Sequence, residues 1–181
     1  MFIQTEGTPN PATLKFLPGT QVMAHGTAYF AAAADAHPSP LAQRLFEVEG
    51  ISGVFLGSDF ITATKSDDKD WAVLKPLVLG AIMEHLSAGH PVITGETESS
   101  NVGEGSDVEV QIKELLETRV RPAVAQDGGD IIFHSFENGI VYLEMQGACS
   151  GCPSSTATLK HGIENMLKHY IPEVMEVRPV E

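Results

Sequence analysis

Residues 131–153 read IIFHSFENGIVYLEMQGACSGCP, and this stretch decides the fold of the second half of the chain. Two runs rich in β-branched and aromatic residues, 131–136 and 140–146, predict two strands. The Asn138-Gly139 pair between them is a strong signal for a β-hairpin. Pro153 follows the second cysteine and favours the first turn of a helix. The stretch therefore predicts a hairpin, a short loop with two cysteines and then a helix.

Helical patterns lie on both sides of this hairpin. Residues 106–109 read SDVE, which fits a capping box with Ser106 at the N-cap and Glu109 three positions later. Because proline cannot continue a regular helix, Arg121-Pro122 is expected to end or bend this first helix. Apolar stripes run along both helices, with Val108, Ile112, Leu115, Leu116 and Val120 in the first and Leu159, Ile163, Met166, Leu167 and Tyr170 in the second. A last strand is expected at 174–178, so the order is helix, strand, strand, helix, strand.

The first half of the chain also mixes strands and helices. Strands are predicted at 2–5, 14–17, 51–56 and 60–65, and a helix is predicted at 40–47. A second helix carries apolar positions at helical spacing, namely Trp71, Leu74, Leu77, Val78, Ala81, Ile82 and His85. Because Pro76 interrupts this pattern, the regular part of the helix is expected to begin near Pro76, after a looser first turn.

The two halves are separated by a polar segment. Residues 87–106 read SAGHPVITGETESSNVGEGS, which is rich in Gly, Ser, Thr and Glu and has no sustained period. Such a composition buries too little apolar surface to offset the entropy of ordering the chain. We expect a flexible linker at 94–106 between an N-terminal domain, residues 1–93, and a C-terminal domain, residues 107–181. The predicted fold class is α+β, with two small α+β domains.

The overall charge excludes several classes of partner. The 181 residues carry a net charge of -13, with 11 basic against 24 acidic residues and no basic cluster. A nucleic-acid binder neutralises phosphates with Lys and Arg, so we expect no nucleic acid as a partner. The same imbalance disfavours an anionic membrane surface. No stretch approaches the roughly 20 apolar residues that cross a bilayer, so no membrane is expected either.

The first residues, MFIQTE, resemble neither a signal peptide nor a transit peptide. We therefore expect the reducing cytoplasm of a bacterium, with a processed form in the mitochondrial matrix as the alternative. In a reducing compartment a structural disulfide is disfavoured, so a reactive or metal-binding role is expected for the cysteines.

Cys149 and Cys152, the only cysteines of the chain, carry the candidate chemistry. They lie where a predicted strand ends and a predicted helix begins, and the helix N-terminus favours thiolates and any anionic cluster. Gly147 and Gly151 allow a tight loop, and Pro153 starts the helix, so these three residues have supporting roles. An iron–sulfur cluster usually takes four thiolates. Two copies of the chain would supply four, which predicts a cluster that bridges a homodimer and is released when the copies separate.

Other interpretations of the cysteine pair remain open. A CxxC pair also serves thiol–disulfide oxidoreductases of the thioredoxin type. It could form half of a zinc site, with His134, His161 or His169 as further ligands and a purely structural role in a zinc-bridged dimer. However, the rise of the predicted helix places His161 about 13 Å and His169 about 25 Å beyond Cys152. A zinc site within one chain is therefore disfavoured.

No catalytic constellation stands out elsewhere, so we do not expect an enzyme. Asp127 and Asp130 flank two glycines and are expected to build a turn rather than an acid pair. His134 is expected to face solvent from its strand. Trp71 and Phe60 are expected to belong to the core rather than to a binding platform.

Several separate motifs, taken together, resemble the NifU-like (Nfu) iron–sulfur scaffold family. In the C-terminal half they are Arg121-Pro122, Asp127-Gly128-Gly129-Asp130 and Gly147-Ala-Cys149-Ser-Gly-Cys152-Pro153-Ser154-Ser155. In the N-terminal half they are Thr8-Pro9-Asn10-Pro11, Leu14-Lys15-Phe16-Leu17, Gly57-Ser-Asp59-Phe60-Ile61-Thr62 and Trp71 with Leu74-Lys75-Pro76. The resemblance covers nearly the whole chain outside the linker.

The resemblance implies a small α+β C-terminal domain that binds a cluster at a dimer interface through Cys149 and Cys152. The cluster it implies is [4Fe–4S], with [2Fe–2S] as the alternative. It also implies delivery to apo iron–sulfur client proteins, after receipt from an upstream cluster-assembly scaffold. The N-terminal domain has no cysteine and is implied to serve client recognition or to tune assembly.

Overall fold

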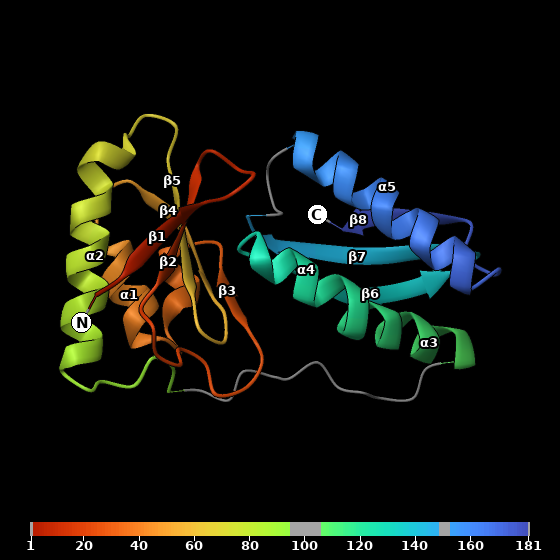
Figure 1. Ribbon diagram of the computed structural model, residues 1–181, viewed down its shortest axis with the longest axis horizontal. Helices are drawn as coiled ribbons and strands as arrows, with labels where there is room; N and C mark the ends of the chain where they lie inside the picture. Colours follow the sequence, from red (N-terminus) through yellow and green to blue (C-terminus); the bar gives the residue numbers. More distant parts are fainter. Residues whose placement is uncertain (1, 95–105, 149–152, 181) are drawn as a thin grey trace. The chain divides into compact units, whose positions relative to one another are not determined.

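The structure is a computed structural model that describes residues 2–94, 106–148 and 153–180. The chain divides into two compact units, Met1–Ser100 and Asn101–Glu181, and each contains helices and one β-sheet (Figure 1). The predicted α+β class with two domains is confirmed. Of the linker predicted at 94–106, only Thr94 and Ser106 belong to the described residues.

The N-terminal unit is built on a five-stranded antiparallel sheet in the order β1-β2-β5-β4-β3. Its strands are β1 (Gln4–Gly7), β2 (Thr13–Leu17), β3 (Ala28–Phe30), β4 (Ile51–Leu56) and β5 (Ile61–Lys65). Its helices are η1 (Ala33–Ala36), α1 (Pro40–Phe46) and α2 (Trp71–Ser87). Figure 1 shows α1 and α2 on the same side of this sheet. The apolar faces of these elements meet in one core, which includes Phe16, Leu41, Leu45, Leu56, Ile61, Leu74 and Ile82.

Most of these helices and strands were predicted from the sequence. The prediction that Phe60 and Trp71 belong to the core is confirmed. Phe60 is buried and stacks on Phe55, and Trp71 packs against the core with its ring edge-on to Phe16. Strand β3 and helix η1 were not predicted. Both are very short, so neither shows a periodic pattern of its own.

The expectation of an irregular first turn before Pro76 was wrong. Helix α2 is continuous from Trp71, because Asp70 caps it by accepting a hydrogen bond from the Ala72 amide at 2.8 Å. Ala72 and Pro76 are both exposed, so the carbonyl group that proline leaves without an intrahelical donor lies on the solvent side. Leu74 and Val78 are buried on the opposite side and hold the helix on the sheet.

The C-terminal unit has the predicted order, with a helical segment, a hairpin, a long helix and a final strand. The helical segment comprises α3 (Asp107–Leu115), the π-helix η2 (Leu116–Val120) and α4 (Arg121–Gln126). The remaining elements are β6 (Gly129–Glu137), β7 (Ile140–Gly147), α5 (Pro153–Tyr170) and β8 (Glu176–Val180). The sheet order is β6-β7-β8, with β6 antiparallel and β8 parallel to β7. Its core includes Ile112, Leu116, Ile131, Leu143, Ile163 and Leu167.

The local signals of the C-terminal sequence are confirmed. The Ser106 amide donates to the Glu109 carboxylate at 2.8 Å, and the Glu109 amide donates to the Ser106 hydroxyl at 3.5 Å, which forms the predicted capping box. Asn138 and Gly139 have φ values of 51° and 80°, which the two central positions of a tight hairpin turn require.

Arg121-Pro122 was expected to end or bend the first helix, and it does not end it. The helical segment passes through the π-helix η2 and continues as α4 with Pro122 in its first turn, where no intrahelical donor is needed. One detail of the C-terminal helices differs from the prediction. Tyr170 does not belong to the apolar stripe of α5. It is 48% exposed, and the Arg119 guanidinium lies 5.1 Å from the centre of its ring.

Candidate functional site

The cysteine loop connects the end of β7 to the start of α5. Cys149, Cys152 and the intervening residues lie outside the described part of the chain, so the site is defined by its two described ends. One end is Gly147 and Ala148, and the other is Pro153. The loop therefore begins where a central strand ends and finishes where a helix of 18 residues begins.

The first end of the loop is held by the Gly-rich turn of the Asp127–Asp130 segment. Gly147 pairs with Gly129 across the sheet, and the Ala148 amide donates to the Gly128 carbonyl oxygen at 3.2 Å. Ala148 is buried. Gly147 and Gly128 have φ values of 65° and 79°, a left-handed conformation that a side chain would strain. Two motifs that are separate in the sequence thus form one structural unit.

An ion pair fixes the strand next to this turn. The Arg121 guanidinium donates from Nε to Asp130 Oδ1 and from Nη2 to Asp130 Oδ2, both at 2.8 Å. The Asp130 side chain is only 4% exposed, and the Ile131 amide also donates to Oδ1 at 2.8 Å. The hydrogen bonds to Asp130 raise the pKa of Arg121 above its ordinary value. Since Asp130 pairs with Gln146, this ion pair supports the strand ends from which the cysteine loop departs.

The second end of the loop is held by the packing of α5. Ile163 and Leu167 are buried, and Glu164 joins the helix to strand β8 by accepting a hydrogen bond from the Val177 amide at 3.2 Å. Lys168, which donates to Glu164, and this amide both lower the pKa of the Glu164 carboxyl group. A helix N-terminus has free amide groups and a partial positive charge, which stabilise nearby thiolates.

The other candidate residues do not form a second site. Asp127 is exposed while Asp130 is buried in the ion pair, so the two do not act as an acid pair. His134, His161 and His169 are each exposed, as expected for His134. Within residues 2–94, 106–148 and 153–180, no three His, Cys, Asp or Glu side chains are grouped to hold a metal ion.

Sequence reasoning from the residues alone missed the pairing of Arg121 with Asp130. The usable signal was an arginine followed nine positions later by an acidic residue at the start of a predicted strand.

Among the described residues, no helix is both long and apolar enough to span a membrane.

These features define a two-domain α+β protein in which a CxxC pair joins a central strand to a helix. Two family profiles match the same two parts of the chain. The NifU-like domain matches residues 112–178, and the N-terminal domain of the scaffold protein Nfu/NifU matches residues 3–89. The chain therefore belongs to the NifU-like (Nfu) family, as the motifs indicated.

Two named relatives are similar to this chain over nearly its whole length, and one solved structure is similar to about half of it. The human protein named "NFU1 iron-sulfur cluster scaffold homolog, mitochondrial" is 52% identical over 183 residues, which cover 99% of this chain and 72% of the human protein. The protein of the same name from Drosophila willistoni is 50% identical over 184 residues, and the chain spans 64% of its length. A NifU-like protein from Saccharomyces cerevisiae, whose solution structure is known, is 29% identical to this chain. The structural match covers 53% of this chain and 87% of the yeast chain, with a TM-score of 0.48.

Proposed function

We propose that the C-terminal domain, residues 107–181, binds an iron–sulfur cluster as cargo through the thiolates of Cys149 and Cys152. The observation that carries the proposal is membership of the Nfu family, whose relatives are named as iron–sulfur cluster scaffolds. The ends of the cysteine loop support it, because a rigid glycine turn and a helix N-terminus would hold two thiolates close to one point.

We further propose that the cluster is [4Fe–4S] and bridges two copies of the chain, with [2Fe–2S] as the alternative. Both cluster types are usually held by four thiolates, and one chain supplies two. In such a homodimer each copy holds half of the ligands, so separation of the copies would open the site. This property suits a protein that receives a cluster from an upstream scaffold and passes it to apo iron–sulfur proteins.

In this proposal the chain is a carrier and not an enzyme, and the N-terminal domain, residues 1–93, recognises clients or tunes assembly. Residues 94–106 would serve as the flexible connection. For the location we propose the mitochondrial matrix in place of the bacterial cytoplasm that the sequence alone favoured, because the human and Drosophila relatives are named as mitochondrial.

Anaerobic reconstitution of the full chain with iron and sulfide tests the cluster proposal. We expect about four irons and four sulfides per dimer, measured by chemical analysis together with the oligomer mass. Cys149→Ala and Cys152→Ala should each abolish cluster binding. Ser150→Ala, in the same loop with both thiols intact, is the matched control and should bind like the wild type.

The alternatives give different results in the same experiment. A monomer that takes up no iron but cycles a Cys149–Cys152 disulfide would overturn the proposal in favour of a thiol–disulfide oxidoreductase. A colourless dimer that holds zinc and survives exposure to oxygen would instead indicate a structural metal bridge.

A further inference from the structure

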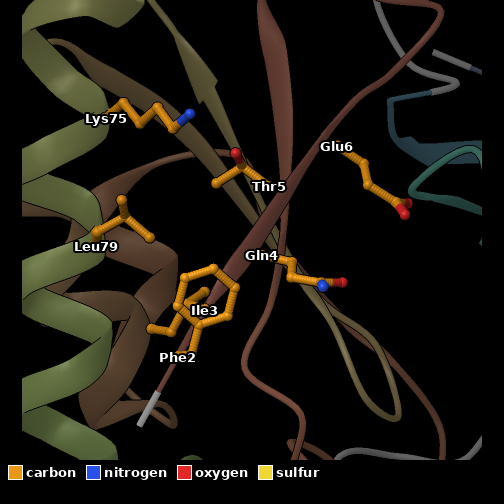
Figure 2. Close-up of a pocket in the computed structure, with 7 residues that line it drawn as sticks. All are labelled: Phe2, Ile3, Gln4, Thr5, Glu6, Lys75 and Leu79. Carbon is orange, nitrogen blue, oxygen red and sulfur yellow. The ribbon is translucent and has the colours of Figure 1, made fainter.

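A groove of about 530 Å³ lies in the N-terminal unit between β1 and α2 (Figure 2). Residues 2–6 line one side of it, and Lys75 and Leu79 line the other. Figure 2 shows both α2 side chains reaching toward β1, with Thr5 opposite Lys75. The groove is far in sequence from the cysteines, and none of the residues that line it belongs to the cysteine loop.

Strand β1 gives the groove an unpaired backbone edge. It is the outermost strand of its sheet and pairs only with β2 in the described part of the chain. Gln4, Glu6 and Gly7 are exposed along it. The outer edge of such a strand presents backbone N–H and C=O groups that match an extended peptide.

Helix α2 gives the groove an apolar wall. Leu79 lines the groove, and Met83, one turn further along on a similar side of α2, is 40% exposed although a surface helix normally shows polar residues outward. Pro76, Leu79 and Met83 follow helical spacing and form a row on the side of α2 that includes the groove residue Leu79. A further strand beside β1 would cover this row, as the present sheet covers the buried face.

The charges in the groove favour an acidic occupant. Glu6 points away from α2 in Figure 2, and its carboxylate lies 3.8 Å from the Lys15 ammonium group. No Asp or Glu carboxylate among the described residues lies within 4.0 Å of the Lys75 ammonium group. The groove therefore contains one cation whose charge is not balanced by a neighbour in the described structure.

We propose that this groove docks an extended segment of a partner protein, which adds to the sheet as a strand beside β1. The segment carries apolar side chains at alternate positions and one acidic side chain in the same row. The acidic side chain pairs with Lys75, and the apolar side chain beside it contacts Leu79. The backbone edge selects an extended chain, the apolar row selects its side chains, and Lys75 selects its charge.

The test uses the full chain labelled with ¹⁵N and a synthetic heptapeptide, Thr-Val-Thr-Asp-Thr-Val-Thr, with blocked ends. Its side-chain pattern is the same in both directions, so the probe does not depend on strand orientation. Titration followed by amide NMR should shift signals from residues 3–7 and 75–83, with a dissociation constant of about 0.1–1 mM for so small a contact.

Two perturbations separate strand addition from non-specific binding. Two heptapeptides are each N-methylated on the alternate amides of one edge. The peptide whose methylated edge faces β1 cannot pair with it, so at least one of the two should lose the shifts. Lys75→Glu should weaken binding of the original peptide roughly fivefold, the upper range for an exposed charge pair. A peptide with lysine in place of aspartate should restore binding to Lys75→Glu.

Lys69→Glu is the matched control, because it makes the same charge change in the same unit outside the groove, in an exposed pair with Glu49. It should bind the original peptide like the wild type. The proposal is overturned if no signal of residues 3–7 shifts at millimolar peptide. It is overturned equally if both N-methylated peptides bind as well as the original, or if Lys75→Glu and Lys69→Glu have the same effect.

Discussion

Replacement of Asp130 by asparagine should destabilise the C-terminal domain selectively. The Asp130 carboxylate is almost fully buried and accepts hydrogen bonds of 2.8 Å from Arg121 Nε, from Arg121 Nη2 and from the Ile131 amide. Asparagine keeps the shape but removes the charge, and it turns an NH₂ group toward the guanidinium. Removal of one partner from a buried ion pair costs about 3–5 kcal/mol. Because Arg121 is 25% exposed and keeps Glu117 as a partner, we expect about 2–3 kcal/mol.

Urea unfolding of the full chain measures this loss, with far-ultraviolet circular dichroism and the amide NMR signals of residues 107–181 as probes. With the dependence of the free energy of unfolding on urea concentration that is typical of a small domain, the urea concentration at the midpoint should fall by about 1–2 M. Trp71, the only tryptophan, lies in the N-terminal unit, so its fluorescence should report an unchanged midpoint. In the cluster reconstitution described above, Asp130→Asn should also bind less iron, since the first end of the cysteine loop is released.

Glu176→Gln is the control, because its pair with Arg178 lies in the same domain but is exposed. Such a pair contributes at most about 1 kcal/mol. If Asp130→Asn costs no more than this control, the Arg121–Asp130 pair does not hold the strand ends and the reasoning is refuted. A parallel shift of the Trp71 transition would refute the assignment of the effect to one domain.

Three further predictions follow from local features. Burial lowers the pKa of His85, whose ring lies 3.0 Å from the Pro91 carbonyl oxygen, so the folded state disfavours the charged form of the ring. The free energy of unfolding of the N-terminal unit should therefore fall as the pH drops below 6.5, by at most about 1.4 kcal/mol per pH unit. His85→Gln should remove that slope in urea titrations at several pH values. Gly139→Ala should cost about 1–2 kcal/mol, because φ is 80° and the new methyl group would lie 2.8 Å from a Met175 carbon. Ser106→Ala should cost about 1 kcal/mol and fray the start of α3 in amide exchange.

Each of these predictions has a matched control. Exposed His25→Gln should leave the dependence on pH unchanged. Gly162→Ala, in a helix with open space around the new methyl group, should stabilise the same domain by about 1 kcal/mol. Ser106→Asp should keep the cap. A loss of stability in Gly162→Ala as large as in Gly139→Ala would show that the left-handed turn is not the cause.

The sequence predicted best where a signal is local. The capping box at Ser106 and the turn at Asn138-Gly139 depend on residues within four positions, and both formed as expected. Pro76 misled because its effect depends on which side of the helix faces solvent, which the sheet decides. The Arg121–Asp130 pair escaped prediction for a similar reason. Arg121 directly follows the π-helix η2, which changes the side of the helix on which it lies, and no propensity encodes such a bulge.

The cysteines of the candidate site were predicted from the sequence, but the contacts that hold the ends of their loop were not. The spacing of the cysteines and the strand–helix junction are readable from the sequence, while the contact between Ala148 and Gly128 joins positions twenty residues apart. The groove beside β1 could not be predicted at all, because its two walls, residues 2–6 and helix α2, meet only in the folded sheet.

The parallel pairing of β7 with β8 has a consequence for biosynthesis. β7 is the central strand of its sheet, and its second neighbour is the last strand in the chain, which pairs through Ile140–Glu176 to Glu144–Val180. During synthesis, Cys149 and Cys152 are added to the chain before residues 176–180. Helix α5 packs in the core through Ile163 and Leu167, and its Glu164 side chain bonds to Val177 once β8 has joined the sheet. This contact therefore forms only after residues 176–180 have been made, and in the proposed function the thiols would bind their cluster after that step.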